Sequence, residues 1–111
     1  MKKTSGIILG LLVTASAGVF AEPSLDEALK HAEAALAEGH KNNAAKLAVH
    51  AKGALDSALT ASIVAKSISK NHINAASEVL QKAIDDASLN QDAAATKAVE
   101  EAVAHLKQAK K

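Results

Sequence analysis

The chain has 111 residues, of which 13 are basic and 12 acidic, and its formal net charge of +1 provides no strongly basic face for nucleic acid. It contains 0 cysteines, which excludes disulfide bonds and a cysteine-linked lipid anchor. Phe20 is its only phenylalanine, tyrosine or tryptophan, so it also lacks a platform for stacking bases and the aromatic anchors of membrane interfaces.

The first residues have the features of a secretory signal peptide. Lys2 and Lys3 precede an apolar run over residues 6–13, and small residues follow as far as Ala21. The run is too short to span a bilayer, which takes about 20 apolar residues. We therefore predict a signal peptide at residues 1–21 and an exported domain at residues 22–111, periplasmic or secreted and without a stable membrane anchor.

Strong helix formers dominate after Pro23 and predict an all-α fold. Ser24 and Glu27 have the S-x-x-E spacing of a capping box and should begin the first helix. The apolar stripe of this helix comprises Leu25, Ala28, Leu29, Ala32, Ala35 and Leu36. Over residues 38–43, a glycine suited to a helix end and two asparagines suited to the next N-cap predict a tight turn between antiparallel helices.

The second helix should bury Leu47, Ala51, Ala54, Leu55 and Ala58. The next turn falls somewhere within residues 59–71, and the sequence leaves its position open. The apolar residues within 63–68 either extend the second helix or begin the third, with Asn71 and Asn74 as alternative caps.

A second hairpin follows. Its first stripe comprises Val79, Leu80, Ala83, Ile84 and Ala87, and its last comprises Ala95, Val99, Ala102 and Leu106. Residues 88–92 separate the two stripes, so the helix-turn-helix unit recurs at a spacing of about 50 residues. The two hairpins can bury their stripes by forming an up-down-up-down four-helix bundle.

The sequence contains no recognisable catalytic triad, phosphate-binding loop or zinc-protease motif, so we do not expect an enzyme. Its unusual feature is a set of histidines: His31, His40, His50, His72 and His105. Neutral imidazole is the commonest protein ligand for transition metals, and helical bundles bind metals through histidines and carboxylates on facing helices.

Two segments place a carboxylate and an imidazole one helical turn apart: Glu27 with His31, and Glu101 with His105. The first and last helices of such a bundle are antiparallel neighbours, so both segments are predicted to meet at one end. His72 would join them if it lies near the start of the third helix, and His50 could form a separate site. His40 belongs to the opposite turn, where solvent exposure is its simplest explanation.

Simpler interpretations remain open. In these, Glu27 serves only the capping box, and His31 and His105 flank the apolar stripes as ordinary boundary residues do. The alternative function is a small structural or interaction bundle that has lost metal binding. A third possibility, a set of apolipoprotein-like helices lying on a membrane, is weaker, because residues 22–111 lack tryptophan and phenylalanine and their polar faces mix charges.

The stretch Lys30-His31-Ala32-Glu33, a glycine-containing turn, His50-Ala51-Lys52 and the closing Ala104-His105-Leu106 resemble the small periplasmic metal-binding protein family. The resemblance extends from Leu25 to about Ala109. It implies a histidine-bearing four-helix bundle that binds divalent metals, chiefly copper but also nickel and zinc, and buffers or scavenges them. His31, His50 and His105 match the family pattern, followed by His72. The family repeats histidine about every heptad, whereas this chain has other residues at many comparable positions, such as Val79.

Together these observations predict a monomeric, exported bundle that binds copper, nickel or zinc. The first expected ligands are His31 and His105, assisted by Glu27 or Glu101. Because a ligating imidazole must be deprotonated, binding should weaken as the pH falls through about 6.5, the ordinary value for histidine.

Overall fold

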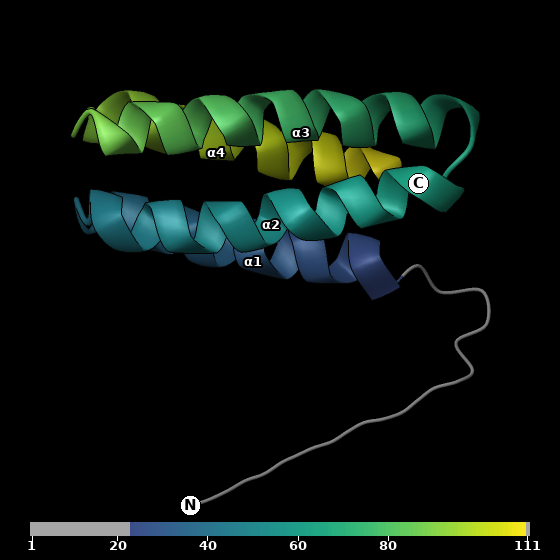
Figure 1. Cartoon of the computed structure of the whole chain (residues 1–111), viewed down its shortest axis with the longest axis horizontal. Helices are drawn as coiled ribbons and strands as arrows, with labels where there is room; N and C mark the ends of the chain where they lie inside the picture. The colour runs from purple at the N-terminus through teal and green to yellow at the C-terminus, as the bar shows by residue number, and fades with distance from the viewer. Residues whose placement is uncertain (1–22, 111) are drawn as a thin grey trace, which may run out of the picture.

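A computed structural model describes residues 23–110, which form four helices: α1 (Pro23–His40), α2 (Ala44–Val64), α3 (Ser67–Ser88) and α4 (Asp92–Ala109). The predicted signal peptide, residues 1–21, lies outside the described residues. The α1–α2 and α3–α4 turns lie at one end, and the α2–α3 connection lies at the other (Figure 1). The predicted up-down-up-down four-helix bundle is confirmed.

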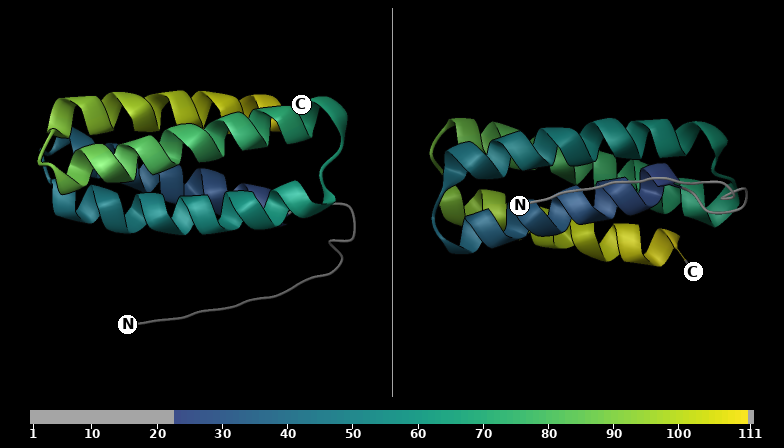
Figure 2. Two further views of the ribbon diagram at one scale, coloured as in Figure 1. Left: turned by 45° about the horizontal axis from the view of Figure 1, so that its top comes forward. Right: turned by 90° about the horizontal axis from the view of Figure 1, so that it is seen from below.

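Each helix has two close neighbours. The α1 helix packs against α2 and α4, and α3 packs against the same two helices, as two further views show (Figure 2). The ends of the second hairpin are tied together by the Ser69 hydroxyl, which donates to the Ala109 carbonyl oxygen at 2.7 Å. None of the four helices is long and apolar enough to cross a bilayer.

The core is built largely from alanine. Its largest fully buried side chains are Leu47, Ile73, Leu80, Val99 and Leu106, and most of the other buried residues are alanines. Such small side chains allow helix axes to approach to about 8 Å, the lower end of the usual range. The predicted stripes are confirmed, but Leu29, Leu36, Leu55, Val79 and Ile84 lie at the partly buried edge of the core.

The two hairpin turns repeat one another. Asn42, with φ 58°, and Asn90, with φ 60°, each supply the left-handed residue that ends the first helix of a hairpin. The Asn43 side chain then caps α2 by accepting a hydrogen bond from the Lys46 N–H at 3.2 Å. The asparagines are 48 residues apart, which agrees with the predicted repeat.

Gly39 lies in the last turn of α1, at the helix end as expected, and it is buried there. A Cβ atom at this position would collide with the Thr96 hydroxyl on α4 and approach Leu47 Cδ1 to 3.0 Å. The glycine therefore allows α1 and α4 to pack closely, while Asn42 provides the left-handed turn.

Two expected helix starts differ from the structure. The α3 helix begins at Ser67 after a two-residue connection, so Asn71 and Asn74 lie inside it rather than capping it. The Lys70 ammonium ties this connection by donating to the Ser62 carbonyl oxygen at 2.8 Å. The α1 helix begins at Pro23, so Ser24 lies in its first turn instead of preceding it.

Candidate metal centre

The structure brings four of the five histidines together as two pairs, one in each hairpin. The ring centroids of His31 on α1 and His50 on α2 are 6.4 Å apart, with 31° between the ring planes. Those of His72 on α3 and His105 on α4 are 5.9 Å apart, with 33° between the planes. Each pair joins the two helices of one hairpin.

The turns set this pairing. In the first hairpin the Asn43 N–H donates to the Glu38 carbonyl oxygen at 3.0 Å. His31 lies seven residues before Glu38, and His50 lies seven residues after Asn43. Seven residues are almost two full helical turns. Two residues equally far from the turn on its two sides therefore both lie at the seam, the line of contact between the two helices of the hairpin.

The second hairpin follows the same rule, but its two histidines lie one heptad further from the turn. Its turn is closed by the Gln91 N–H, which donates to the Asp86 carbonyl oxygen at 2.9 Å. His72 lies fourteen residues before Asp86, and His105 lies fourteen residues after Gln91. The histidine pairs therefore occupy the same seam of their hairpins at different distances from the turns.

The separation within each pair suits a shared metal ion. An ion bound by an imidazole nitrogen at about 2.0 Å lies about 3.2 Å from the ring centroid, so two rings sharing it lie at most about 6.4 Å apart. Both observed separations, 6.4 Å and 5.9 Å, satisfy this limit. The 6.4 Å separation equals the limit, so the two nitrogens of the first pair would bind on opposite sides of the ion.

Glu27 provides a nearby carboxylate for the first pair. Its Oε1 atom lies 3.9 Å from His31 Nε2, and the His31 and Glu27 side chains are 40% and 63% exposed. Within residues 23–110, however, no three histidine or carboxylate side chains converge closely enough to form a preassembled site. Glu27 would have to change rotamer to become a third ligand.

Glu101, the predicted partner of His105, lies in a different environment. It lines a shallow hollow with Lys82 and Lys97. The hydrogen bond from Lys82 Nζ to Asp86, 2.8 Å long, raises the pKa of Lys82, and Glu101 adds to this effect. The positive charge of Lys82 thus acts on the carboxylate that would have to bind a metal beside His105.

The single site expected around both Glu-x-x-x-His segments is not formed among the described residues. His31 faces His50 instead of His105, because the turn register aligns α1 with α2. His72 faces His105 across the second hairpin. His40 is exposed at the end of α1. As expected, it lies at the hairpin turn and not at the end of the bundle where the single site was predicted.

Sequence reasoning missed Gly53, the glycine that accommodates the first pair. A Cβ atom on Gly53 would lie 3.2 Å from Cγ and Nδ1 of His31. Glycine inside a helix costs about 1 kcal/mol relative to alanine, so this position gives up helix stability while leaving room for the imidazole. The available signal was a glycine in the middle of a helix, three residues after His50.

Replacing Gly53 by alanine should therefore separate metal binding from stability. The new methyl group displaces the His31 ring, which is exposed enough to swing outward, so binding at this pair weakens. Without metal, the free energy of unfolding should stay constant or rise by up to about 1 kcal/mol. Metal titration and urea unfolding of the same samples measure both effects. Loss of stability without weaker binding would contradict this role for Gly53.

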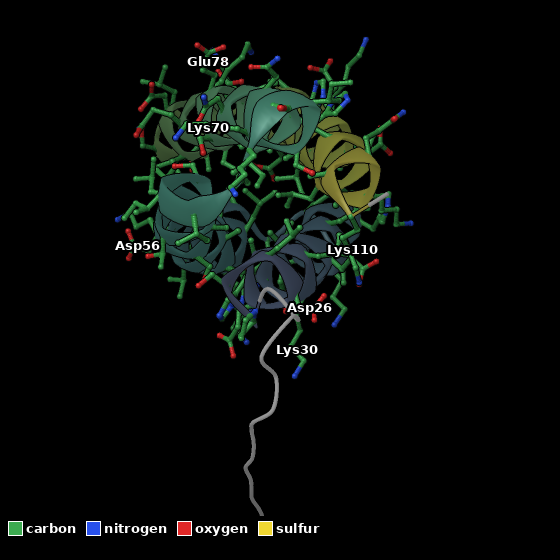
Figure 3. All side chains as sticks on the ribbon, turned by 90° about the vertical axis from the view of Figure 1, so that its right-hand side faces the viewer. Asp26, Lys30, Asp56, Lys70, Glu78 and Lys110 are labelled. Carbon is green, nitrogen blue, oxygen red and sulfur yellow. The ribbon has the colours of Figure 1, made fainter. Side chains whose placement is uncertain are left out.

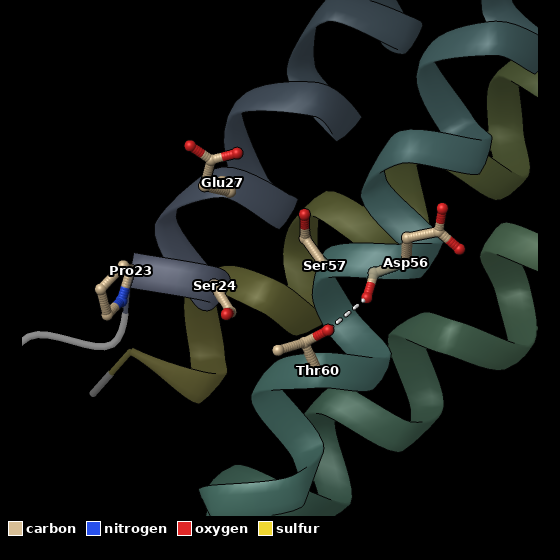
Figure 4. A pocket seen from close by; sticks show the side chains of 6 residues that line it. All are labelled: Pro23, Ser24, Glu27, Asp56, Ser57 and Thr60. Atoms are coloured by element: carbon tan, nitrogen blue, oxygen red, sulfur yellow. Dashed lines mark hydrogen bonds between the residues drawn. The ribbon is translucent and has the colours of Figure 1, made fainter. Parts of the chain in front are cut away.

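Each hairpin has a hollow where the other has its histidine pair. Ser24 and Ser57 correspond to His72 and His105 after a shift of 48 residues, and both serines line a hollow with Glu27 (Figure 4). In the same way His50 corresponds to Ala98, which lines the hollow beside Glu101. The repeated scaffold thus offers four equivalent positions, of which two carry paired histidines.

A four-helix bundle with paired imidazoles across its hairpins falls into the class of metal-binding helical bundles. Comparison with known proteins agrees with this class. The chain belongs to the small metal-binding protein family, which it matches over residues 1–109. No curated protein matches the chain.

Proposed function

We propose that the protein binds divalent transition metals, copper above all, at two separate sites formed by His31 with His50 and by His72 with His105. The observation that carries this proposal is the two cross-hairpin imidazole pairs, with centroids 6.4 and 5.9 Å apart. Glu27 can supplement the first site, 3.9 Å from His31. Glu101, beside Lys82 and Lys97, contributes less to the second.

The ligand set supports copper over zinc. Structural zinc sites use four protein ligands and catalytic zinc sites use three, whereas each pair here supplies two imidazoles. Copper(II) binds nitrogen ligands most strongly among the common divalent metals and accepts a tetragonal arrangement that water can complete. Nickel follows copper in this order and should bind next best.

Partly exposed sites with two protein ligands favour exchange over permanent retention. Such a protein can buffer or scavenge metal ions, and its open, water-completed sites give no indication of catalysis. The signal-like sequence at residues 1–21 supports a periplasmic or secreted location. We propose that it acts there as a monomer, because each site is completed within one hairpin.

Calorimetric titration of copper into residues 22–111 should show about two bound ions. His50→Ala should remove one of them, and His72→Ala should remove the other, because each substitution breaks a different pair. The double variant should bind neither ion. Calorimetry suits a chain without tryptophan or tyrosine, which offers no intrinsic fluorescence to follow.

His40→Ala is the matched control, since His40 is exposed at the end of α1 outside both pairs. It should retain both ions. Loss of all binding in either single variant would show one shared site instead of two. No heat above dilution for the unsubstituted protein would support the alternative function, a helical bundle without metal binding.

A further inference from the structure

The connection between α2 and α3 exposes a group of aliphatic side chains. Ile63, Val64 and Ile68 are 76%, 59% and 70% exposed, and Leu59, one turn earlier on α2, is 49% exposed. We call these four residues, together with Lys66 and Lys70, the α2–α3 tip. It lies at the end of the bundle opposite the two hairpin turns (Figure 1).

The tip is positively charged as well as apolar. Residues 57–77 contain no aspartate or glutamate, whereas they include Lys66 and Lys70. Both lysines are exposed, and the bond from Lys70 Nζ to the Ser62 carbonyl oxygen, 2.8 Å long, holds this ammonium beside the connection.

Acidic side chains at the same end lie beside the tip and not on it: Glu27 and Asp56 line the neighbouring hollow between α1 and α2 together with Thr60. Asp26 at the start of α1 is paired with Lys110 of α4 at 2.9 Å. Both residues are labelled in the view onto this end (Figure 3). The nearest acidic residues along the chain, Asp56 and Glu78, lie outside residues 57–77.

The opposite end of the bundle has a different character. The residues flanking its turns include Glu38, Asp85, Asp86 and Asp92, and the large aliphatic side chains strongly exposed towards this end are Leu89 and Val49, which lie far apart in the sequence. The basic, apolar surface is therefore confined to the α2–α3 tip.

We propose that the α2–α3 tip docks end-on onto an anionic phospholipid surface. Its aliphatic side chains would enter the boundary between headgroups and acyl chains, and its two lysines would lie at the level of the anionic headgroups. Docking would be reversible, because four aliphatic side chains and two lysines form a small anchor and none of the described helices can span a bilayer. The proposal does not depend on metal binding.

The charges favour a membrane over a second copy of the chain. A tip-to-tip dimer would bring Lys66 and Lys70 of both copies together without any acidic residue of the tip to offset them. The surface also lacks the tryptophan, tyrosine and arginine that dominate specific protein interfaces. Lipid accepts aliphatic side chains without needing a shaped pocket.

The test is co-sedimentation of residues 22–111 with vesicles of phosphatidylcholine alone or mixed with phosphatidylglycerol, at low and high salt. These residues contain the whole described bundle and omit the apolar run at 6–13, which would bind lipid by itself. We expect binding to the mixed vesicles that weakens with salt. Lys66→Gln with Lys70→Gln should reduce affinity about fivefold per lysine, since each contributes about 1 kcal/mol.

Ile63→Ser with Ile68→Ser tests the apolar part and should weaken binding at least about tenfold. Val49→Ser, which changes an aliphatic residue 66% exposed elsewhere, and Lys41→Gln with Lys46→Gln at the opposite end should leave binding unchanged. Circular dichroism confirms that each variant remains helical. The proposal is overturned by equal binding to neutral and mixed vesicles, by equal loss in the control variants, by no binding, or by dimerisation through the tip without vesicle binding.

Discussion

Replacing Ser24 and Ser57 together by histidine should increase the number of bound copper ions from two to three. The two serines stand fourteen residues from the first turn, on either side of it, as His72 and His105 do from the second. Their side chains face the same hollow between α1 and α2 (Figure 4). Two imidazoles introduced there should form a cross-hairpin pair like that of the second hairpin.

The surroundings of this hollow favour the new site. Both serines are only partly buried, so imidazoles can replace them without entering the core. Glu27 and Asp56 line the hollow and could supply a carboxylate ligand. Among residues 23–110 no lysine lines it, in contrast to the hollow beside Glu101 in the second hairpin.

The control keeps the same change in composition but breaks the register. Ser24→His with Ser62→His also adds two histidines, yet Ser62 is five residues further along α2 and lies on another side of the helix. Calorimetry should give about two ions for this variant and three for the matched pair. Equal stoichiometry for the two variants would mean that distance from the turn does not determine where metals bind.

Replacing Leu80 by alanine should lower the free energy of unfolding by about 2–5 kcal/mol. Leu80 is one of the few large, fully buried side chains in a core made mostly of alanine, so its neighbours cannot refill the space. A domain of this size has a total stability of about 4–13 kcal/mol, and the loss is therefore a large fraction of it. Urea unfolding followed by circular dichroism measures the change.

Leu89→Ala is the matched control, because Leu89 is 66% exposed and its removal should change stability by less than about 0.5 kcal/mol. Copper at a hundred times its dissociation constant should restore about 2.7 kcal/mol per site to the Leu80 variant. Equal effects of the two leucine substitutions would contradict the packing described for the core. A midpoint of unfolding that is insensitive to copper would contradict metal binding to the folded form.

Part of the candidate site could have been found by counting along the sequence. Once the turns at Asn42 and Asn90 are assigned, His31 and His50 are equally far from the first, and His72 and His105 are equally far from the second. Reasoning from carboxylates one turn away from a histidine instead favoured contact between the first and last helices. The i, i+4 contact of Glu27 with His31 does form, at 3.9 Å, but it does not decide which neighbouring helix the imidazole faces.

The sequence by itself determined the four helices, their apolar stripes, the two hairpin turns and the internal repeat. Helix propensity, periodicity and turn residues are local properties, so the order of residues is sufficient to specify them. Only the tertiary structure decided that the second connection takes two residues, that Gly39 and Gly53 make room for Thr96 and His31, and that the histidines pair within each hairpin. These features depend on how each helix is rotated against its neighbours, and that rotation is set by packing of the whole alanine-rich core.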